Sequence, residues 1–161
     1  FRLKDTPEAA EEPEEAEAVE EPEEVETVET PEVEDIPMEP VGKPMPIMSQ
    51  KDIELIALVM LAEAEGECEL GQRLVIDVIL NRMDSPKYPD NAHDVIYQPG
   101  QFTSMWGTRV DRVTVTDEAI NLVEEELASR TNYEVLYFRT KHYHKFGTPL
   151  FQVGNHYFST H

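Results

Sequence analysis

Residues 53–67 read IELIALVMLAEAEGE, and this stretch decides the fold because its apolar side chains recur at helical spacing. One face of the predicted helix carries Ile53, Ile56, Ala57, Met60, Leu61 and Ala64. Ser49 and Asp52 form a capping pattern in front of this run, and Gly66 is a natural stop after it. The sequence therefore predicts a largely buried helix that begins after Ser49.

A second helix is predicted for residues 71–83, where apolar side chains cover nearly the whole circumference: Leu74, Val75, Ile76, Val78, Ile79 and Leu80. We expect it to be the central helix of the core. A short helix over 92–97 has Asn91 as its cap, and a further helix runs from Thr116 through Leu127.

The residue types change after this last helix. VLYF at 135–138 and LFQV at 150–153 are β-type runs, separated by a polar segment that contains Gly147 and Pro149. The pattern predicts a hairpin or two short paired strands. The fold class is therefore α+β, with helices first and a small antiparallel element last.

The N-terminal segment has a different composition from the rest of the chain. Residues 1–50 hold 17 acids and 3 bases, 8 of the 12 prolines and one of the 13 aromatic side chains. Such a segment cannot bury enough apolar surface to offset its chain entropy. We expect a disordered Glu/Pro-rich acidic spacer over residues 1–48 and one folded domain over 49–161.

Several classes of protein are excluded by composition. A formal net charge of −21 argues against a nucleic-acid partner, which would need clustered Lys and Arg. Cys68 is the single cysteine, so an internal disulfide is impossible.

Phe1 is not an initiator Met, so we expect a mature form or a fragment, with an export signal, membrane anchor or wall-targeting region outside it.

The sharpest chemical signal is AEAEGE at 62–67, where Glu63 shares a helical turn with apolar positions. The helix C-terminus and desolvation both disfavour a carboxylate there, so we expect an acid that is protonated near neutral pH. Such an acid suits general-acid cleavage of a glycosidic bond. A solvated acidic helix end is the alternative interpretation.

Six short motifs occur in order over residues 51–158: AEAEGE at 62–67, GQ at 71–72, LNR at 80–82, YQPGQF at 97–102, LYF at 136–138 and GNHYF at 154–158. Together they resemble the cell wall hydrolases typified by bacterial spore cortex-lytic enzymes. The resemblance implies that 49–161 is an exported, peptidoglycan-cleaving catalytic domain with a lysozyme-like helical core, similar to lytic transglycosylases, located outside the cell or in its envelope. It also implies that Glu63 is the catalytic acid and that no metal or cofactor is needed.

The remaining candidate site residues are interpreted from their surroundings. Glu67 is given a supporting role, because a helix-end acid that satisfies nearby backbone donors explains it equally well. Gln101 and Phe102 follow Gly100 in an irregular, polar segment over 98–112, so we place them in a sugar-binding cleft. The alternative is a structural turn whose Phe102 ring fills the core. Tyr137, Asn155 and His156 are further candidates for substrate contacts, with core positions as the alternative for the rings.

Two other functions stay open at this point. His142, His144 and His156 could form a zinc site, which would indicate a zinc-dependent peptidoglycan amidase or peptidase. No H-E-x-x-H or C-x-x-C pattern accompanies them. The domain could also be a wall-binding module without catalysis. Whether cleavage gives a 1,6-anhydro product or proceeds by hydrolysis is not decided by the sequence.

Overall fold

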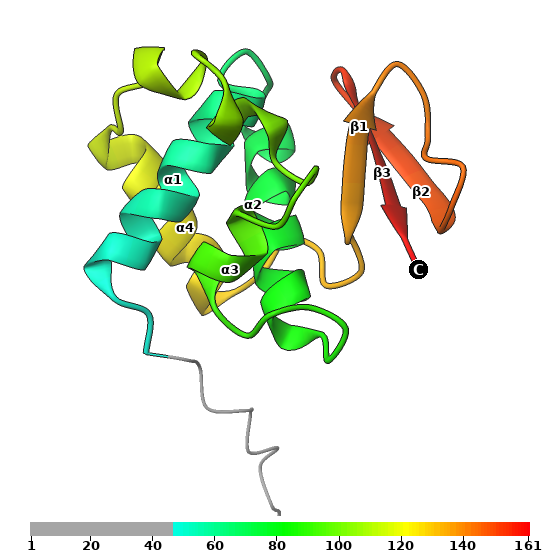
Figure 1. Ribbon diagram of the computed structural model, residues 1–161, viewed down its shortest axis with the longest axis horizontal. Coiled ribbons are helices and arrows are strands. Elements are labelled where there is room, and N and C mark those ends of the chain that lie inside the picture. Colours follow the sequence, from blue (N-terminus) through cyan, green and yellow to red (C-terminus); the bar gives the residue numbers. More distant parts are fainter. Residues whose placement is uncertain (1–46) are drawn as a thin grey trace, which may run out of the picture. The chain divides into compact units, whose positions relative to one another are not determined.

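The structure is a computed structural model that describes residues 47–161 (Figure 1). The acidic spacer predicted for 1–48 lies outside these residues except for its last two, so it stays a prediction. The described helices are α1 (Gln50–Ala64), α2 (Glu69–Asp84), α3 (Ala92–Ile96) and α4 (Asp117–Ala128), with short 3₁₀ turns at Thr103–Trp106 and Val110–Arg112. None of the helices in this range is long and apolar enough to cross a membrane.

The predicted starts of α1, α3 and α4 are confirmed, whereas α2 begins at Glu69, two residues before its predicted start. The Ser49 hydroxyl oxygen accepts the backbone N–H of Asp52 at 3.2 Å, which satisfies one of the free donors at the start of α1. Thr116 caps α4 in the same way through the N–H of Ala119 at 3.2 Å. α1 packs against α2, α3 and α4, which explains why its apolar stripe is so wide.

α2 is the core helix, as predicted, and every side chain from Leu74 to Leu80 is buried. The polar side chains of Asn81 and Arg82, near the C-terminal end of α2, are also buried. Asn81 donates to the carbonyl of Val135 at 2.9 Å, and the Arg82 Nε–H donates to the carbonyl of Leu136 at 2.8 Å. These two side chains therefore attach the chain that leads into the sheet to the end of α2.

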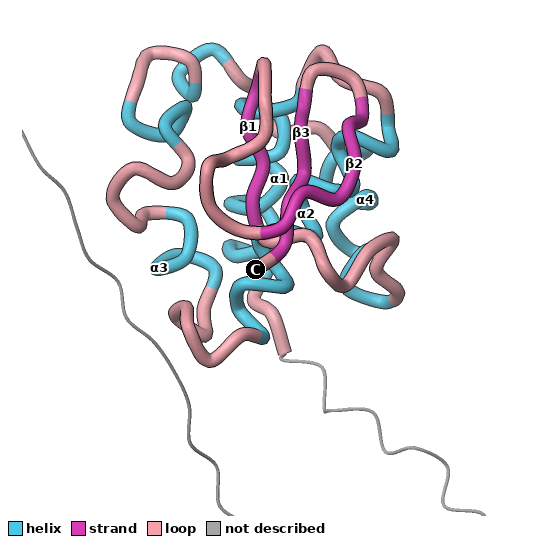
Figure 2. Tube along the Cα trace, turned by 90° about the vertical axis from the view of Figure 1, so that its right-hand side faces the viewer, coloured by secondary structure: helices cyan, strands magenta, loops and turns pink. Residues whose placement is uncertain are grey.

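The sheet consists of β1 (Tyr137–Thr140), β2 (Thr148–Val153) and β3 (His156–Thr160), all antiparallel in the order β1-β3-β2. The α+β class is confirmed, but the predicted pairing of the two β-type runs with each other is wrong. β3 folds back on β2 through a tight turn at Gly154 and then lies between β1 and β2. Figure 2 shows the three strands in front of α1 and α2.

The inner face of the sheet closes the core. Phe158 is fully buried on the central strand, where it pairs with Phe138 of β1 and Phe151 of β2. The ring of Phe138 lies 6.0 Å from that of Phe158 and 6.1 Å from that of Phe102. Burial of such rings stabilises a fold by roughly 2 kcal/mol each, which fixes the sheet against the helices.

Candidate active site

A cleft opens where the end of α1, the irregular segment 98–112 and the sheet meet. It consists of two adjoining hollows of about 440 and 380 Å³ that share Glu63, Arg109, Thr140 and His156. The first hollow is also lined by Glu67, Lys141, Gln152, Asn155 and Tyr157. The second is also lined by Gln101, Thr103, Phe138, Arg139 and His144. The structure therefore brings together Glu63, Glu67, Gln101, Asn155 and His156 from the sequence-predicted site.

Glu63 lies in the last turn of α1 and is half-buried. Its Oε1 accepts the backbone N–H of Ser104 at 3.3 Å and also the Ser104 hydroxyl. Within residues 47–161, Oε2 has no hydrogen-bond partner. One carboxyl oxygen is thus held in place while the other is left for a ligand. Ser104 was missed by the sequence analysis, whose only signal for it was its position in the polar segment 98–112.

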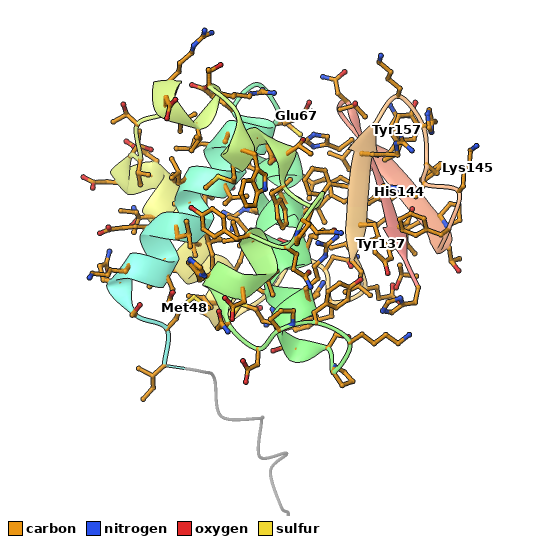
Figure 3. The ribbon with its side chains drawn as sticks, viewed as in Figure 1. Met48, Glu67, Tyr137, His144, Lys145 and Tyr157 are labelled. Atoms are coloured by element: carbon orange, nitrogen blue, oxygen red, sulfur yellow. The ribbon has the colours of Figure 1, made fainter. Side chains whose placement is uncertain are left out.

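Glu67 is positioned differently, because both of its oxygens are occupied. Oε2 accepts the backbone N–H of Asn155 at 3.0 Å, and Oε1 accepts the Asn155 side-chain amide at 2.9 Å. Burial raises the pKa of Glu67, but the hydrogen bonds from Asn155 outweigh it and lower the pKa below its ordinary value. Glu67 is therefore an ionised anchor for the β2–β3 turn, at the end of the sheet where Figure 3 labels it.

The turn that Glu67 holds has room for glycine alone. Gly154 has a φ of +56°, and a Cβ added there would collide with Oε2 of Glu67. Both the backbone conformation and the close carboxylate therefore require a residue without a side chain.

His156 forms a wall of both hollows and is 3% exposed. Burial lowers its pKa, and this effect outweighs the opposing charges of Glu67 and Glu63. Its Nδ1 is buried without a partner among the described residues. The ring is therefore neutral near pH 7 and contributes a polar wall to the cleft.

Gln101 is exposed in the second hollow, and Arg82 fixes the orientation of its side-chain amide. Its Oε1 accepts a hydrogen bond from Arg82 Nη1 at 2.6 Å. Because arginine only donates, the amide oxygen must face Arg82, and the NH₂ group is left as the available donor. Gln101 can therefore donate to a carbonyl or hydroxyl oxygen of a ligand.

Two predicted substrate contacts are corrected by the structure. Phe102 is 1% exposed in the core, so its ring cannot touch a ligand in the cleft. Tyr137 lines neither hollow; its hydroxyl is 2.8 Å from that of Tyr88 and 3.1 Å from Nδ1 of His161. Figure 3 shows Tyr137 at the opposite end of the sheet from Glu67. Phe138 lies in the second hollow instead.

The histidines do not form a metal site. Among residues 47–161 there is no group of three His, Cys, Asp or Glu side chains that could hold a metal ion. His142 Nδ1 lies 2.9 Å from the carbonyl of Tyr143, and His144 Nε2 lies 3.3 Å from the carbonyl of Phe138. The zinc-dependent alternative therefore has no ligand set in the described part of the chain.

Comparison with known proteins identifies the family of the chain. The sequence profile described as "Cell Wall Hydrolase" matches residues 66–159, more than half of the chain. The chain belongs to the cell wall hydrolase family. The matched region of this cell wall hydrolase contains Glu67, Gln101, Asn155 and His156, while Glu63 lies just before it.

Relatives in the cell wall hydrolase family include a spore cortex-lytic enzyme of Halalkalibacterium halodurans, 39% identical over 88 residues that cover 55% of this chain and 24% of that protein. The spore cortex-lytic enzyme of Bacillus subtilis is 42% identical over 57 residues, covering 35% of this chain and 19% of that protein. The chain thus spans about a quarter or less of the length of these relatives.

Solved structures extend the similarity to the whole fold. The catalytic domain of the Bacillus cereus SleB protein matches with a TM-score of 0.64 and 27% identity, covering 74% of this chain and 99% of that one. The catalytic domain of a germination-specific lytic transglycosylase, SleB from Bacillus anthracis, matches with a TM-score of 0.62 and 27% identity, covering 71% and 98%. The described fold of this cell wall hydrolase is therefore that of a SleB-like catalytic domain.

Proposed function

We propose that the domain over 49–161 cleaves the glycan strands of peptidoglycan between N-acetylmuramic acid and N-acetylglucosamine, as a lytic transglycosylase, with Glu63 as the single general acid and base. The observation that carries this proposal is the difference between the two cleft carboxyl groups. Glu63 keeps one oxygen open, whereas both oxygens of Glu67 are engaged by Asn155.

The proposed reaction uses the one open carboxyl group twice. Protonated Glu63 donates its proton to the glycosidic oxygen as the bond to C1 breaks, which leaves an oxocarbenium-like centre on the muramic acid sugar. The Glu63 carboxylate then removes the proton of the sugar's own 6-hydroxyl, whose oxygen attacks C1. The product is a 1,6-anhydro sugar, and the carboxyl group is protonated again.

Surrounding groups would support this chemistry without adding a second catalytic carboxylate. Ser104 holds Oε1 of Glu63, which fixes the direction of Oε2 toward the cleft. The NH₂ group of Gln101 is available to an N-acetyl or hydroxyl oxygen of the sugar. A hydrolase would need a second acid to activate water or attack C1, and Glu67 is already committed to the β2–β3 turn.

The names of the relatives favour the same substrate. The related proteins are spore cortex-lytic enzymes, and one matching structure is a lytic transglycosylase. We therefore propose peptidoglycan as the macromolecular partner and a site of action outside the cell or in its envelope. A membrane anchor or wall-targeting region outside the given residues would fit this location.

Product analysis tests the proposal directly. Purified peptidoglycan would be digested with the full chain in water labelled with heavy oxygen, and the soluble fragments analysed by mass spectrometry. We expect anhydro-muramic ends, lighter by one water than reducing ends and free of label. Labelled reducing ends would show hydrolysis instead. Release of stem peptides that stops with a chelator would indicate the amidase alternative, and wall binding without soluble products would indicate a binding module.

A further inference from the structure

The walls of the cleft are rich in cationic side chains, although the domain is acidic. Residues 51–161 hold 17 acids and 10 bases. Three of those bases, Arg109, Arg139 and Lys141, line the two hollows, and the only carboxyl groups beside them are Glu63 and Glu67. The cleft therefore reverses the charge balance of the surrounding surface.

These three cations are not used in internal ion pairs. Within the described range, Arg73 pairs with Glu69, Glu125 and Glu126, and Arg130 pairs with Asp84. No carboxylate in that range lies within ion-pair distance of the three cleft cations. Their charge is therefore available to a ligand.

Each of the three cations lines a hollow that Glu63 also lines. Arg109 lines both hollows, and its charge is one of the influences that lower the pKa of His156. Arg139, on β1, lines the second hollow, and Lys141, directly after β1, lines the first. A glycan strand that fills both hollows would therefore meet at least one cation in each of them.

We propose that Arg109, Arg139 and Lys141 form a carboxylate-reading wall, through which this enzyme selects glycan strands that carry free carboxylates. The inference rests on the proposed glycan cleavage. Peptidoglycan carboxylates occur on the stem peptides and on the lactyl groups of those muramic acid units that carry no stem peptide. Guanidinium and ammonium groups bind carboxylates by charge-assisted hydrogen bonds, whereas a strand whose carboxylates are amidated offers them no charge.

The first experiment compares two forms of one substrate. Initial rates of the full chain would be measured on soluble peptidoglycan strands and on the same strands after their carboxylates are converted to primary amides with carbodiimide and ammonia. We expect amidation to lower kcat/KM by roughly tenfold, mainly through KM, because several exposed ion pairs are lost. Added salt should weaken cleavage of the native strands alone.

The source of the carboxylates is assigned by a third substrate, from which the stem peptides have been removed at their amide bond, so that all of its carboxylates are lactyl groups. Preference for this substrate over its amidated form would assign the wall to the lactyl groups. Loss of the preference on removal of the stems would assign it to the peptides.

Single variants test whether the three cations cause the preference for native over amidated strands. Arg109→Gln, Arg139→Gln and Lys141→Gln should each lower kcat/KM on native strands by roughly twofold to fivefold, with no effect on amidated strands. Lys145→Gln is the matched control. It removes the same charge from an exposed position that lines neither hollow, and Figure 3 shows Lys145 projecting away from the helices.

The outcomes separate this inference from the proposed function. Equal cleavage of native and amidated strands, or variants that slow both equally, would overturn the carboxylate-reading wall while glycan cleavage stands. Cleavage of neither strand by the unaltered protein would overturn the proposed function, and the inference with it.

Discussion

Two pairs of carboxyl groups in the helical part of the molecule differ in how completely their oxygens are hydrogen-bonded. Glu63 and Glu67 face the cleft, whereas Asp77 and Glu126 are buried between α2 and α4 with 0% and 1% exposure. Glu126 accepts hydrogen bonds from Arg73 at 2.8 Å and from the N–H and hydroxyl of Thr131 at 2.6 and 2.9 Å.

The buried pair shares one proton. Burial, followed by the neighbouring Glu126, raises the pKa of Asp77 to about 8. Burial also works against ionised Glu126, but hydrogen bonds from Asp77, Arg73 and Thr131 lower its pKa overall. Asp77 is therefore the protonated partner. Its Oδ2 accepts the N–H of Asn132 at 2.7 Å, which leaves Oδ1 to carry the proton toward Glu126.

The comparison separates the carboxyl groups that hold the fold together from the one that we propose as the catalytic acid. Glu126 and Glu67 accept hydrogen bonds at both oxygens, and Asp77 is fully buried and held through Oδ2, so these three groups hold segments together. Glu63 is held through Oε1 alone and keeps Oε2 open to the cleft. Substitutions in each pair should therefore separate activity from stability.

The largest expected effect is on catalysis. Glu63→Gln should lower glycan cleavage by roughly a thousandfold, because the amide keeps the shape of the side chain but cannot transfer a proton. The melting temperature should barely change. Turbidity loss of purified walls and circular dichroism would be measured on the same preparation. A variant that clears walls at near the original rate would show that Glu63 is not the acid.

The buried pair should show the opposite pattern. Glu126→Gln weakens the buried hydrogen bonds from Arg73 and Thr131, although Arg73 keeps Glu69 and Glu125, and should lower the free energy of unfolding by roughly 2 kcal/mol. Urea denaturation would measure this loss, and the specific activity of the folded fraction should be unchanged. Loss of activity in the folded fraction would show that this pair communicates with the cleft.

Asp77→Asn is the matched variant, because its amide can still donate toward Glu126 and accept from Asn132. The pKa of Asp77 is raised in the folded state, so its contribution to stability is fully present below its ordinary pKa near 4 and is lost as pH rises toward about 8. We expect the unaltered protein to lose stability over this window and the variant to lose less. Parallel pH profiles of the unfolding free energy would contradict the shared proton.

The anchor at the β2–β3 turn should give an intermediate effect. Glu67→Gln weakens the hydrogen bonds to Asn155 and should cost about 1 kcal/mol of stability, with activity reduced by roughly tenfold through a displaced turn. Gly154→Ala, which places a methyl group against the same carboxylate, should reproduce both losses. If Glu67→Gln abolishes cleavage while Gly154→Ala does not, Glu67 takes part in the chemistry and a two-carboxylate hydrolase is favoured.

The smallest expected effect is at Gln101. Gln101→Glu keeps an acceptor for Arg82 but replaces the NH₂ donor that faces the cleft. We expect kcat/KM to fall by roughly fivefold, equivalent to about 1 kcal/mol, with unchanged or higher thermal stability. Initial rates and melting temperatures would be compared with those of Gln101→Ala. Unchanged rates in both variants would remove Gln101 from the substrate contacts.

The sequence by itself determined the helices, their caps and the α+β class, because these depend on side chains within one or two turns of each other. Ser49, Asn91 and Thr116 act on donors three residues along the chain. The sequence also singled out Glu63, since a carboxyl group among apolar positions near a helix end is visible as a local pattern.

Only the tertiary structure decided which side chains share the cleft. Ser104 meets Glu63 across 41 positions of sequence, and Asn155 meets Glu67 across 88. The packing of the sheet and of the segment 98–112 on the helices likewise decides that Phe138 lies in the cleft while Phe102 is buried and Tyr137 lies elsewhere. Such contacts depend on how elements distant in the chain pack together, and no short-range pattern of apolar and polar residues encodes that packing.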